Sequence, residues 1–205
     1  MYSIDTTSLP LKVKLEVSSS NAHYYPTLTQ YNNEYIFVFG GKKTAKCELY
    51  FINYNKWKNI PPLPEERYGA VAFMHLPSYS IYLFGGMNAE KKFISSIIKI
   101  CLPSFVSWET VYVKESNQEL LQRAFPLIYY PQDSNDKFYI LGGEKKDNET
   151  SDGIIIIEFN KWDMTVKESR IKMMNKISFR HKKQIFVILG IKVFIIMMMK
   201  KEKNL

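Results

Sequence analysis

The chain has 205 residues, of which 46% are hydrophobic and 15% aromatic, enough apolar material for one buried core or a little more. Its formal net charge is +8, but residues 160–205 hold 12 Lys and Arg against 3 Asp and Glu, whereas the other 159 residues hold 16 against 17. The basic excess therefore lies near the C-terminus, where lysines are usually solvated, and the nearly neutral body argues against nucleic-acid binding.

Residues 1–19 are expected to form an N-terminal segment with one strand at Leu11–Val17. The first ten residues have no apolar core and no early positive charge, so they do not make a secretory signal. The two cysteines, Cys47 and Cys101, indicate neither a disulfide framework nor a metal site. A reducing, cytoplasmic setting is the simplest expectation.

A short apolar run that ends in two glycines recurs along the chain. The copies are Tyr35–Gly41, Ile81–Gly86 and Phe138–Gly143, and a fourth, Ile185–Gly190, has Ile191 in place of the second glycine. Because these runs barely alternate, each predicts a strand buried on both faces. Glycines at the strand end permit positive φ and a close approach of another backbone, which a Cβ would block.

Two further landmarks recur in phase with the diglycines, namely a tryptophan and then an arginine. They are Trp57, Trp108 and Trp162, and Arg67, Arg123 and Arg170. A β-rich stretch follows each arginine. One unit is therefore predicted to hold four strands: the diglycine strand, one around Tyr50 or its equivalent, one at the tryptophan and one after the arginine. Four short strands in a repeat of about 40–50 residues indicate an all-β fold of propeller blades.

At this point the sequence resembles a known family, the kelch repeats. The resemblance rests on the diglycine Gly40-Gly41, on Tyr50 and on Trp57 seven residues later. The second and third units have Cys101 and Ile155 at the tyrosine position.

The resemblance covers roughly residues 20–190 and implies kelch-type β-propeller blades of four antiparallel strands. About three blades and a partial fourth are expected, near residues 32–80, 81–136 and 137–183 and from 184 onward.

Propellers usually contain 4–8 blades, so about three blades leave apolar end faces open. Three explanations stand: a fragment or truncated gene product of a larger propeller, a ring completed by self-association, or an open array with covered ends. Residues 191–205 are expected to be a hydrophobic and then basic tail. The apolar run 185–199 would make a helix of about 22 Å, shorter than the ~30 Å hydrocarbon core. We therefore expect a pair of strands or a non-native terminus there, rather than a membrane anchor.

No catalytic constellation is evident, so we expect no enzyme activity, cofactor or metal. His23, His75 and His181 lie far apart in the repeat order and have no partner at metal-ligand spacing. The diglycines end strands and do not open helices, so no phosphate-binding loop is predicted. The kelch resemblance includes one enzyme class, the copper radical oxidases similar to galactose oxidase, and this class is kept as the alternative function.

The loop after each intact diglycine carries a lysine pair, and the pairs are Lys42-Lys43, Lys91-Lys92 and Lys145-Lys146. If the blades are equivalent, the three loops emerge on one face and form a basic rim suited to an acidic segment of another protein. The competing interpretation is that they are ordinary solubility residues. Arg67 and Arg123 either pair with loop carboxylates or project into the same binding face, and the tryptophans are expected to pack between blades.

The resemblance to kelch proteins implies a protein–protein interaction module, an adaptor or scaffold that binds its partner through inter-strand loops. Self-association is a further expectation, because it would cover open blade faces. Neither nucleic acid nor a membrane is expected as a partner.

Overall fold

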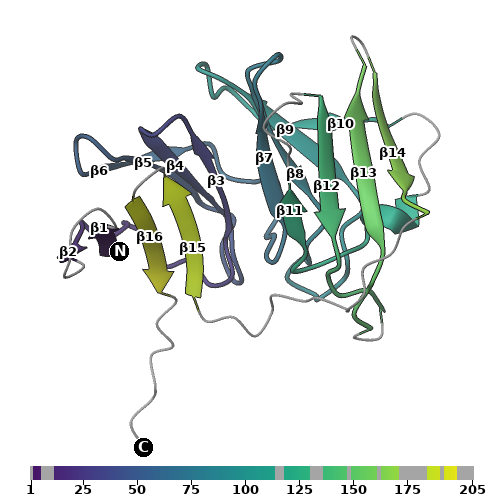
Figure 1. Cartoon of the computed structure of the whole chain (residues 1–205), viewed down its shortest axis with the longest axis horizontal. Helices are drawn as coiled ribbons and strands as arrows, with labels where there is room; N and C mark the ends of the chain where they lie inside the picture. Colours follow the sequence, from purple (N-terminus) through teal and green to yellow (C-terminus); the bar gives the residue numbers. More distant parts are fainter. Residues whose placement is uncertain are drawn as a thin grey trace, which may run out of the picture.

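The structure is a computed structural model, and every strand in its described part belongs to an antiparallel four-stranded sheet (Figure 1). It describes residues 2–5, 12–113, 118–129, 136–146, 149–160, 163–170, 184–189 and 192–197. One short 3-10 turn, η1 (Gln118–Leu121), interrupts the strands. No helix in these residues is long and apolar enough to cross a bilayer. The prediction of an all-β fold built from blade-type sheets is confirmed.

Three of the sheets follow one another along the chain, each as an up-and-down meander in which sequence neighbours pair. Sheet I contains β3 (Thr27–Tyr31), β4 (Tyr35–Phe39), β5 (Cys47–Phe51) and β6 (Lys56–Ile60). Sheet II contains β7 (Val71–His75), β8 (Ser80–Phe84), β9 (Ile97–Cys101) and β10 (Glu109–Val111). Sheet III contains β11 (Leu127–Tyr129), β12 (Lys137–Leu141), β13 (Ile154–Phe159) and β14 (Met164–Glu168).

Sheet IV joins strands from both ends of the chain in the order β15-β16-β1-β2. Its strands are β15 (Gln184–Leu189), β16 (Lys192–Met197), β1 (Tyr2–Asp5) and β2 (Lys12–Leu15). The β15–β16 hairpin is the strand pair predicted for the apolar run 185–199. The pairing of β1 with β16, with Tyr2 opposite Ile195, was not predicted, and it brings part of the tail from residue 191 into a sheet.

Sheets I to III begin one strand earlier than the repeat units drawn from the sequence. The diglycine strand pairs with the strand before it, with Thr27 opposite Phe39 in sheet I and Val71 opposite Phe84 in sheet II. A short turn makes this pairing possible, and Asn32 takes the positive φ of 49° that a tight hairpin requires. The strands after Arg67 and Arg123 therefore open sheets II and III instead of closing the previous sheets.

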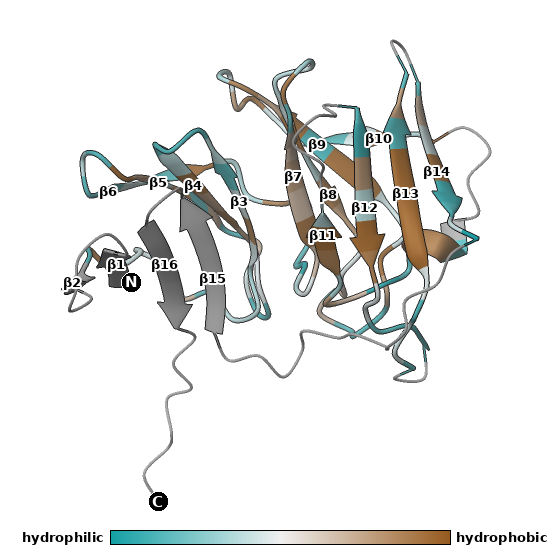
Figure 2. Cartoon of the chain, in the orientation of Figure 1, coloured by the Kyte–Doolittle hydropathy of each residue, from teal (hydrophilic) through white to brown (hydrophobic). Residues whose placement is uncertain are grey.

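The sheets stack through their inner strands in the order IV, I, II, III, since β15 contacts β3, β3 contacts β7 and β7 contacts β11. Hydrophobic side chains fill each of the two interfaces among sheets I, II and III. The ribbon of β7, β12 and β13 is accordingly brown, the colour of hydrophobic residues, over much of its length (Figure 2). Between sheets II and III the rings of Phe73 and Phe138 lie 3.8 Å apart, and between sheets I and II Leu83 packs with Phe37 and Phe39. The core is therefore a row of inter-sheet layers.

The diglycine strands differ in how many faces they bury. Every residue of β8 is buried, and in β4 only Tyr35 is less than fully buried. In β12 burial alternates, because Phe138 and Ile140 face sheet II whereas Lys137, Tyr139 and Leu141 are half-buried on the other side. The prediction of strands buried on both faces is confirmed for β4 and β8 and wrong for β12, since sheet III has a described neighbouring sheet on one face only.

The second diglycine shows why these positions exclude larger residues. Gly85 and Gly86 have φ of 60° and 86°, and a Cβ on Gly86 would lie 2.8 Å from the carbonyl oxygen of Tyr68. A Cβ on Gly85 would meet the carbonyl oxygen of Arg123. Gly86 N–H donates to that same oxygen at 2.7 Å, and Gly41 N–H donates in the same way to Arg67 at 2.9 Å. The first two diglycines therefore fasten sheets I and II to the connections that open sheets II and III.

Candidate functional site

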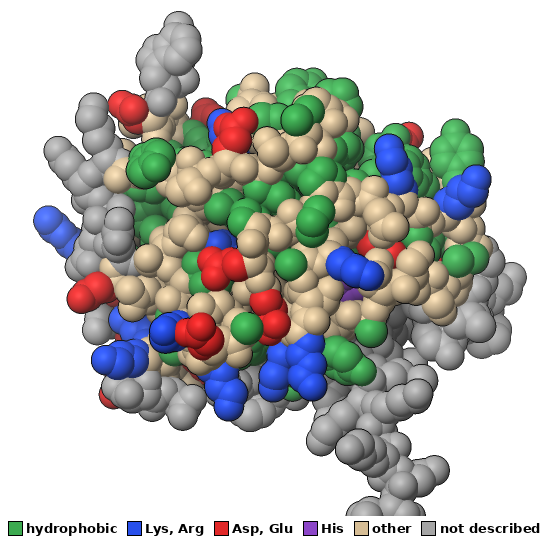
Figure 3. Space-filling model, turned by 180° about the vertical axis from the view of Figure 1, so that it is seen from behind, with side chains coloured by type: hydrophobic (Ala, Val, Ile, Leu, Met, Phe, Trp, Pro, Cys, Tyr) green, Lys and Arg blue, Asp and Glu red, His purple; other side chains and the backbone are tan. Residues whose placement is uncertain are grey.

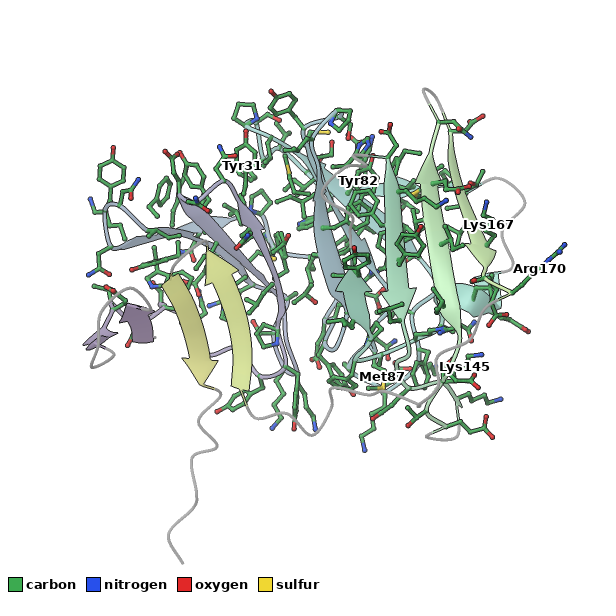
Figure 4. All side chains as sticks on the ribbon, viewed as in Figure 1. Tyr31, Tyr82, Met87, Lys145, Lys167 and Arg170 are labelled. Atoms are coloured by element: carbon green, nitrogen blue, oxygen red, sulfur yellow. The ribbon has the colours of Figure 1, made fainter. Side chains whose placement is uncertain are left out.

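The connections β4–β5, β8–β9 and β12–β13 leave the first three sheets at one end of the molecule, which we call the diglycine end. Met87 and Lys145, from two of these connections, are both at the lower edge in Figure 4, whereas Tyr31 and Tyr82 lie toward the other end. Backbone hydrogen bonds join the three sheets at this end. Gly69 N–H donates to the carbonyl oxygen of Tyr25 at 3.1 Å, and Phe125 N–H donates to the carbonyl oxygen of Gly69 at 2.6 Å.

An aromatic cluster fills the space beside these bonds, and we call it the hub. Its members are Tyr25, Tyr68, Met87, Phe93, Ala124 and Phe125. The rings of Tyr25 and Phe125 meet edge to face at 5.5 Å, and both residues take φ of 54°. Because the connections before β3, β7 and β11 converge here, the hub fixes the loops of the diglycine end relative to one another.

The six predicted lysines all lie in the diglycine-end connections, and five of them are exposed while Lys145 is half-buried. The turns that carry them are fixed by local bonds. In sheet II the backbone N–H groups of Glu90 and Lys92 donate to Asn88 Oδ1 at 3.1 and 3.0 Å. Lys92 Nζ also pairs with Glu90 at 2.7 Å, which lowers the pKa of that carboxyl group through its hydrogen bond and charge.

Carboxylates share this end of the molecule with the lysines. Glu65 and Glu66 lie in the connection between sheets I and II, and Glu149 follows the third lysine pair. In the rear view, Asp and Glu side chains lie among the Lys and Arg side chains along the lower edge (Figure 3). The surface is thus a mixed one in which positive charge is concentrated locally at the lysine pairs.

Arg67 and Arg123 lie inside the molecule, each with 1% of its surface exposed, rather than on the predicted binding face. Arg67 donates to the carbonyl oxygen and the hydroxyl of Ser96 at 3.2 and 2.8 Å. Arg123 donates to the carbonyl oxygens of Gly142 and Gly153 at 3.1 and 2.9 Å. Carbonyl dipoles offset the cost of removing each guanidinium from water, so both arginines support the sheets from within.

Burial also governs the electrostatics of these arginines. It lowers the pKa of Arg67 to about 10. It lowers the pKa of Arg123 as well, against the opposing charge of Glu168, whose carboxylate lies 3.6 Å away. Arg170, the third sequence landmark, is exposed after β14 and takes no equivalent buried place.

His23 occupies in sheet I the place that the arginines hold in sheets II and III, and the sequence did not single it out for this role. Its Nδ1 lies 2.6 Å from the carbonyl oxygen of Gly40, and its Nε2 lies 2.8 Å from the fully buried carboxylate of Glu48. The available signal was the alignment of His23–Pro26 with Arg123–Pro126, in which the proline and an aromatic residue match.

The tryptophans connect neighbouring sheets. Trp108 Nε1 donates to the carbonyl oxygen of Pro61, just after β6, at 3.0 Å, and its ring meets Phe39 edge to face at 5.4 Å. Trp57 Nε1 donates to Val17, two residues after β2, at 2.9 Å. Each indole therefore reaches the end of the preceding sheet, which agrees with a packing role. Trp162 lies outside the described residues.

The end opposite the lysines exposes apolar side chains in its turns, which was not predicted. Tyr54 in the β5–β6 turn is 76% exposed, Tyr79 in the β7–β8 turn 57%, and Val106 in the β9–β10 loop 79%. These positions are separate turns with no shared sequence motif, so no periodic pattern marks them in advance.

A cleft of about 520 Å³ lies between sheets II and III and is lined by His75, Tyr82, Lys99 and Phe159, among others. The buried His75 ring stacks on Phe159 at 4.0 Å. Its Nδ1 lies 2.8 Å from Ser78 Oγ, and its Nε2 lies 3.4 Å from Asp136 Oδ1. Burial lowers the pKa of His75, and the hydrogen bond to Asp136 opposes the shift.

Metal ligands do not converge anywhere in the described part of the chain, where no three His, Cys, Asp or Glu side chains are placed to hold one ion. His23 and His75 belong to different sheets, and His181 lies outside the described residues.

Comparison with known proteins supports the fold. No protein-family model and no curated protein matches the sequence. The solved structure of YjhT superposes on 90% of this chain with a TM-score of 0.69 and 15% sequence identity. The chain spans 62% of the length of YjhT. At this identity the likeness shows a shared fold and nothing about function.

Proposed function

We propose that the protein is a kelch-type interaction module, an adaptor or scaffold whose lysine loops bind an acidic segment of another protein. One observation carries the proposal: three lysine pairs lie in fixed turns at the same end of three stacked sheets. Loops that are already ordered lose little conformational entropy when a partner binds.

The geometry suggests the form of the ligand. Stacked sheets lie on the order of 10 Å apart, and about three residues of extended chain span that distance. An extended segment with acidic residues at about every third position would therefore meet one lysine pair after another. The carboxylates of Glu65, Glu66 and Glu90 repel a segment whose acidic residues do not coincide with the lysine pairs. This repulsion adds selectivity for segments with the matching spacing.

A titration with a fluorescently labelled acidic peptide tests the proposal by anisotropy. Exposed ion pairs contribute about 0.2–1 kcal/mol each, so replacing both Lys42 and Lys43 with Gln is expected to weaken binding by roughly twofold to thirtyfold. Replacing all six lysines should weaken it further and flatten its dependence on salt. The matched control replaces Lys56 and Lys58, which are exposed on β6. Equal losses in the loop and control variants would contradict the proposal.

The same proposal places the protein in the cytosol, where thiols stay reduced. Its support is that Cys47 and Cys101 are both free, and Cys47 is buried. Burial raises the pKa of the Cys47 thiol to about 12, so this cysteine is a packing residue without thiolate chemistry.

A further inference from the structure

The two interfaces among sheets I, II and III differ in the loop that lies over them at the end opposite the lysines. Between sheets I and II, the β9–β10 loop at residues 102–108 places the ring of Phe105 5.9 Å from that of Phe37. The corresponding β13–β14 turn is shorter, at residues 160–163. The cleft of about 520 Å³ lies between sheets II and III, beside this shorter turn, and its volume falls within the roughly 300–1,000 Å³ of small-molecule sites.

One wall of the cleft carries a lysine at a place that is apolar in the preceding interface. Lys99 and Leu49 hold equivalent places, because each stands opposite the residue three positions before its own diglycine. Leu49 is 4% exposed in the core between sheets I and II, whereas the Lys99 side chain is 30% exposed and lines the cleft. A partly buried ammonium group needs acceptors, and Glu109 supplies one at 3.3 Å. Because the ammonium group has three N–H donors, it can also donate to a ligand in the cleft.

The two walls of the cleft carry opposite charges. On sheet II, burial works against the charge of Lys99, but the hydrogen bond to Glu109 outweighs it and raises the pKa of Lys99 above its ordinary value. Asp163 lines the cleft from the side of sheet III, in the β13–β14 turn. Burial lowers the pKa of His75, so this lining side chain adds no charge at neutral pH. A ligand with a single charge is attracted by one wall and repelled by the other, whereas a zwitterion complements both.

Aromatic side chains form much of the remaining lining, namely those of Tyr82, Tyr112 and Phe159. Phe159 is fixed by stacking on His75 at 4.0 Å and by an edge-to-face contact with Tyr82 at 5.0 Å. Rings held in this way favour a flat apolar group, which can meet them face to edge or offset. Tyr82 lies toward the end of the molecule away from Lys145, so the cleft is separate from the lysine loops (Figure 4).

We infer that the cleft binds a small zwitterion with an aromatic ring, such as an aromatic amino acid, with its acid group at Lys99 and its amino group at Asp163. The charges of the two walls orient the ligand, and the aromatic lining holds its ring. This site does not depend on the proposed binding of an acidic segment, because the lysine loops lie at the other end of the molecule.

Titration of the isotope-labelled protein with L-phenylalanine, followed by two-dimensional NMR, tests the inference. Saturable shifts are expected in the backbone signals of residues that line the cleft, such as Lys99, Val111 and Phe159. Two matched compounds separate the charges: phenethylamine lacks the acid group, and 3-phenylpropionate lacks the amino group. Each should bind more weakly than L-phenylalanine, because each leaves one charged wall without its partner.

Variants of the two walls assign the charges. Lys99→Met should weaken L-phenylalanine binding about tenfold without weakening phenethylamine binding. Its fold should be unchanged by circular dichroism, because Leu49 already occupies the equivalent place. Asp163→Asn should weaken L-phenylalanine binding about twofold to fivefold without weakening 3-phenylpropionate binding, since this carboxylate is exposed. The control, Lys58→Met on the exposed side of β6, should bind all three compounds as the wild type does.

No saturable shift at the cleft up to about 10 mM L-phenylalanine overturns the inference. Equal affinity for the three compounds, or L-phenylalanine binding that Lys99→Met leaves unchanged, overturns it as well. Shifts confined to residues outside the cleft would contradict the assigned site. The acidic peptide should bind Lys99→Met and the wild type equally, so the cleft and the proposed function can fail separately.

Discussion

Replacing Gly85 with Ala tests whether the diglycines fasten neighbouring sheets. Gly85 has φ of 60°, and a Cβ there would meet the carbonyl oxygen of Arg123 and lie 3.1 Å from that of Leu121. The left-handed conformation costs a non-glycine residue about 1–2 kcal/mol. Moving the Arg123 carbonyl would also weaken the bond from Gly86 N–H, worth about 1 kcal/mol. The expected loss of unfolding free energy is therefore about 2–3 kcal/mol.

Urea denaturation followed by fluorescence measures this loss, with Gly153→Ala as the matched control. Gly153 has no positive φ, and an added Cβ would meet the end of the partly exposed Glu168 side chain at 2.6 Å and that of Arg123 at 3.0 Å. Because Glu168 can move aside, the control should lose about 1 kcal/mol or less. If Gly85→Ala loses no more stability than Gly153→Ala, the reasoning about the diglycine contacts is refuted.

Two further predictions concern the interfaces between sheets. Burial lowers the pKa of His75 in the folded chain, so the unfolded chain binds more protons near the ordinary value of about 6.5, and stability falls as pH falls through that range. The urea midpoint should therefore decrease more in the wild type than in His75→Gln when the pH is lowered from about 7.5 to about 5.5. Equal decreases in the two proteins would show that His75 does not cause the pH dependence. Trp108→Phe should lose about 1–2 kcal/mol because Pro61 then lacks its indole donor. A loss no larger than about 0.3 kcal/mol in thermal or urea unfolding would show that the bond contributes little.

Much of the fold follows from local signals in the sequence. The apolar runs before Gly40 and Gly85 indicate buried strands because few other environments accept four or five consecutive hydrophobic residues next to a diglycine. Tryptophans in phase with them mark the inter-sheet contacts, as Trp108 shows. Such signals are short-range, and they locate strands better than they determine which strands pair.

Sheet IV and the arginines show where local signals fail. Pairing of β1 with β16 joins residues almost a chain length apart, and a four-residue strand such as Tyr2–Asp5 has too little pattern to reveal its partner. The residue type of Arg67 does not reveal whether its side chain is exposed or buried. Its burial depends on hydrogen bonds to the carbonyl oxygen and hydroxyl of Ser96, which come close to it only in the folded chain. In sheet I a histidine, His23, takes the place of the arginine, so a search for a repeated arginine does not find it.

The placement of the binding surface at the diglycine end is the claim on which the functional account depends. Hydrogen–deuterium exchange of the protein with and without an acidic peptide tests it most directly. The account predicts slower exchange in the connections around Lys42, Lys91 and Lys145 when the peptide is bound. Protection at the turns around Tyr54, Tyr79 and Val106 instead would move the site to the opposite end of the molecule and contradict the account.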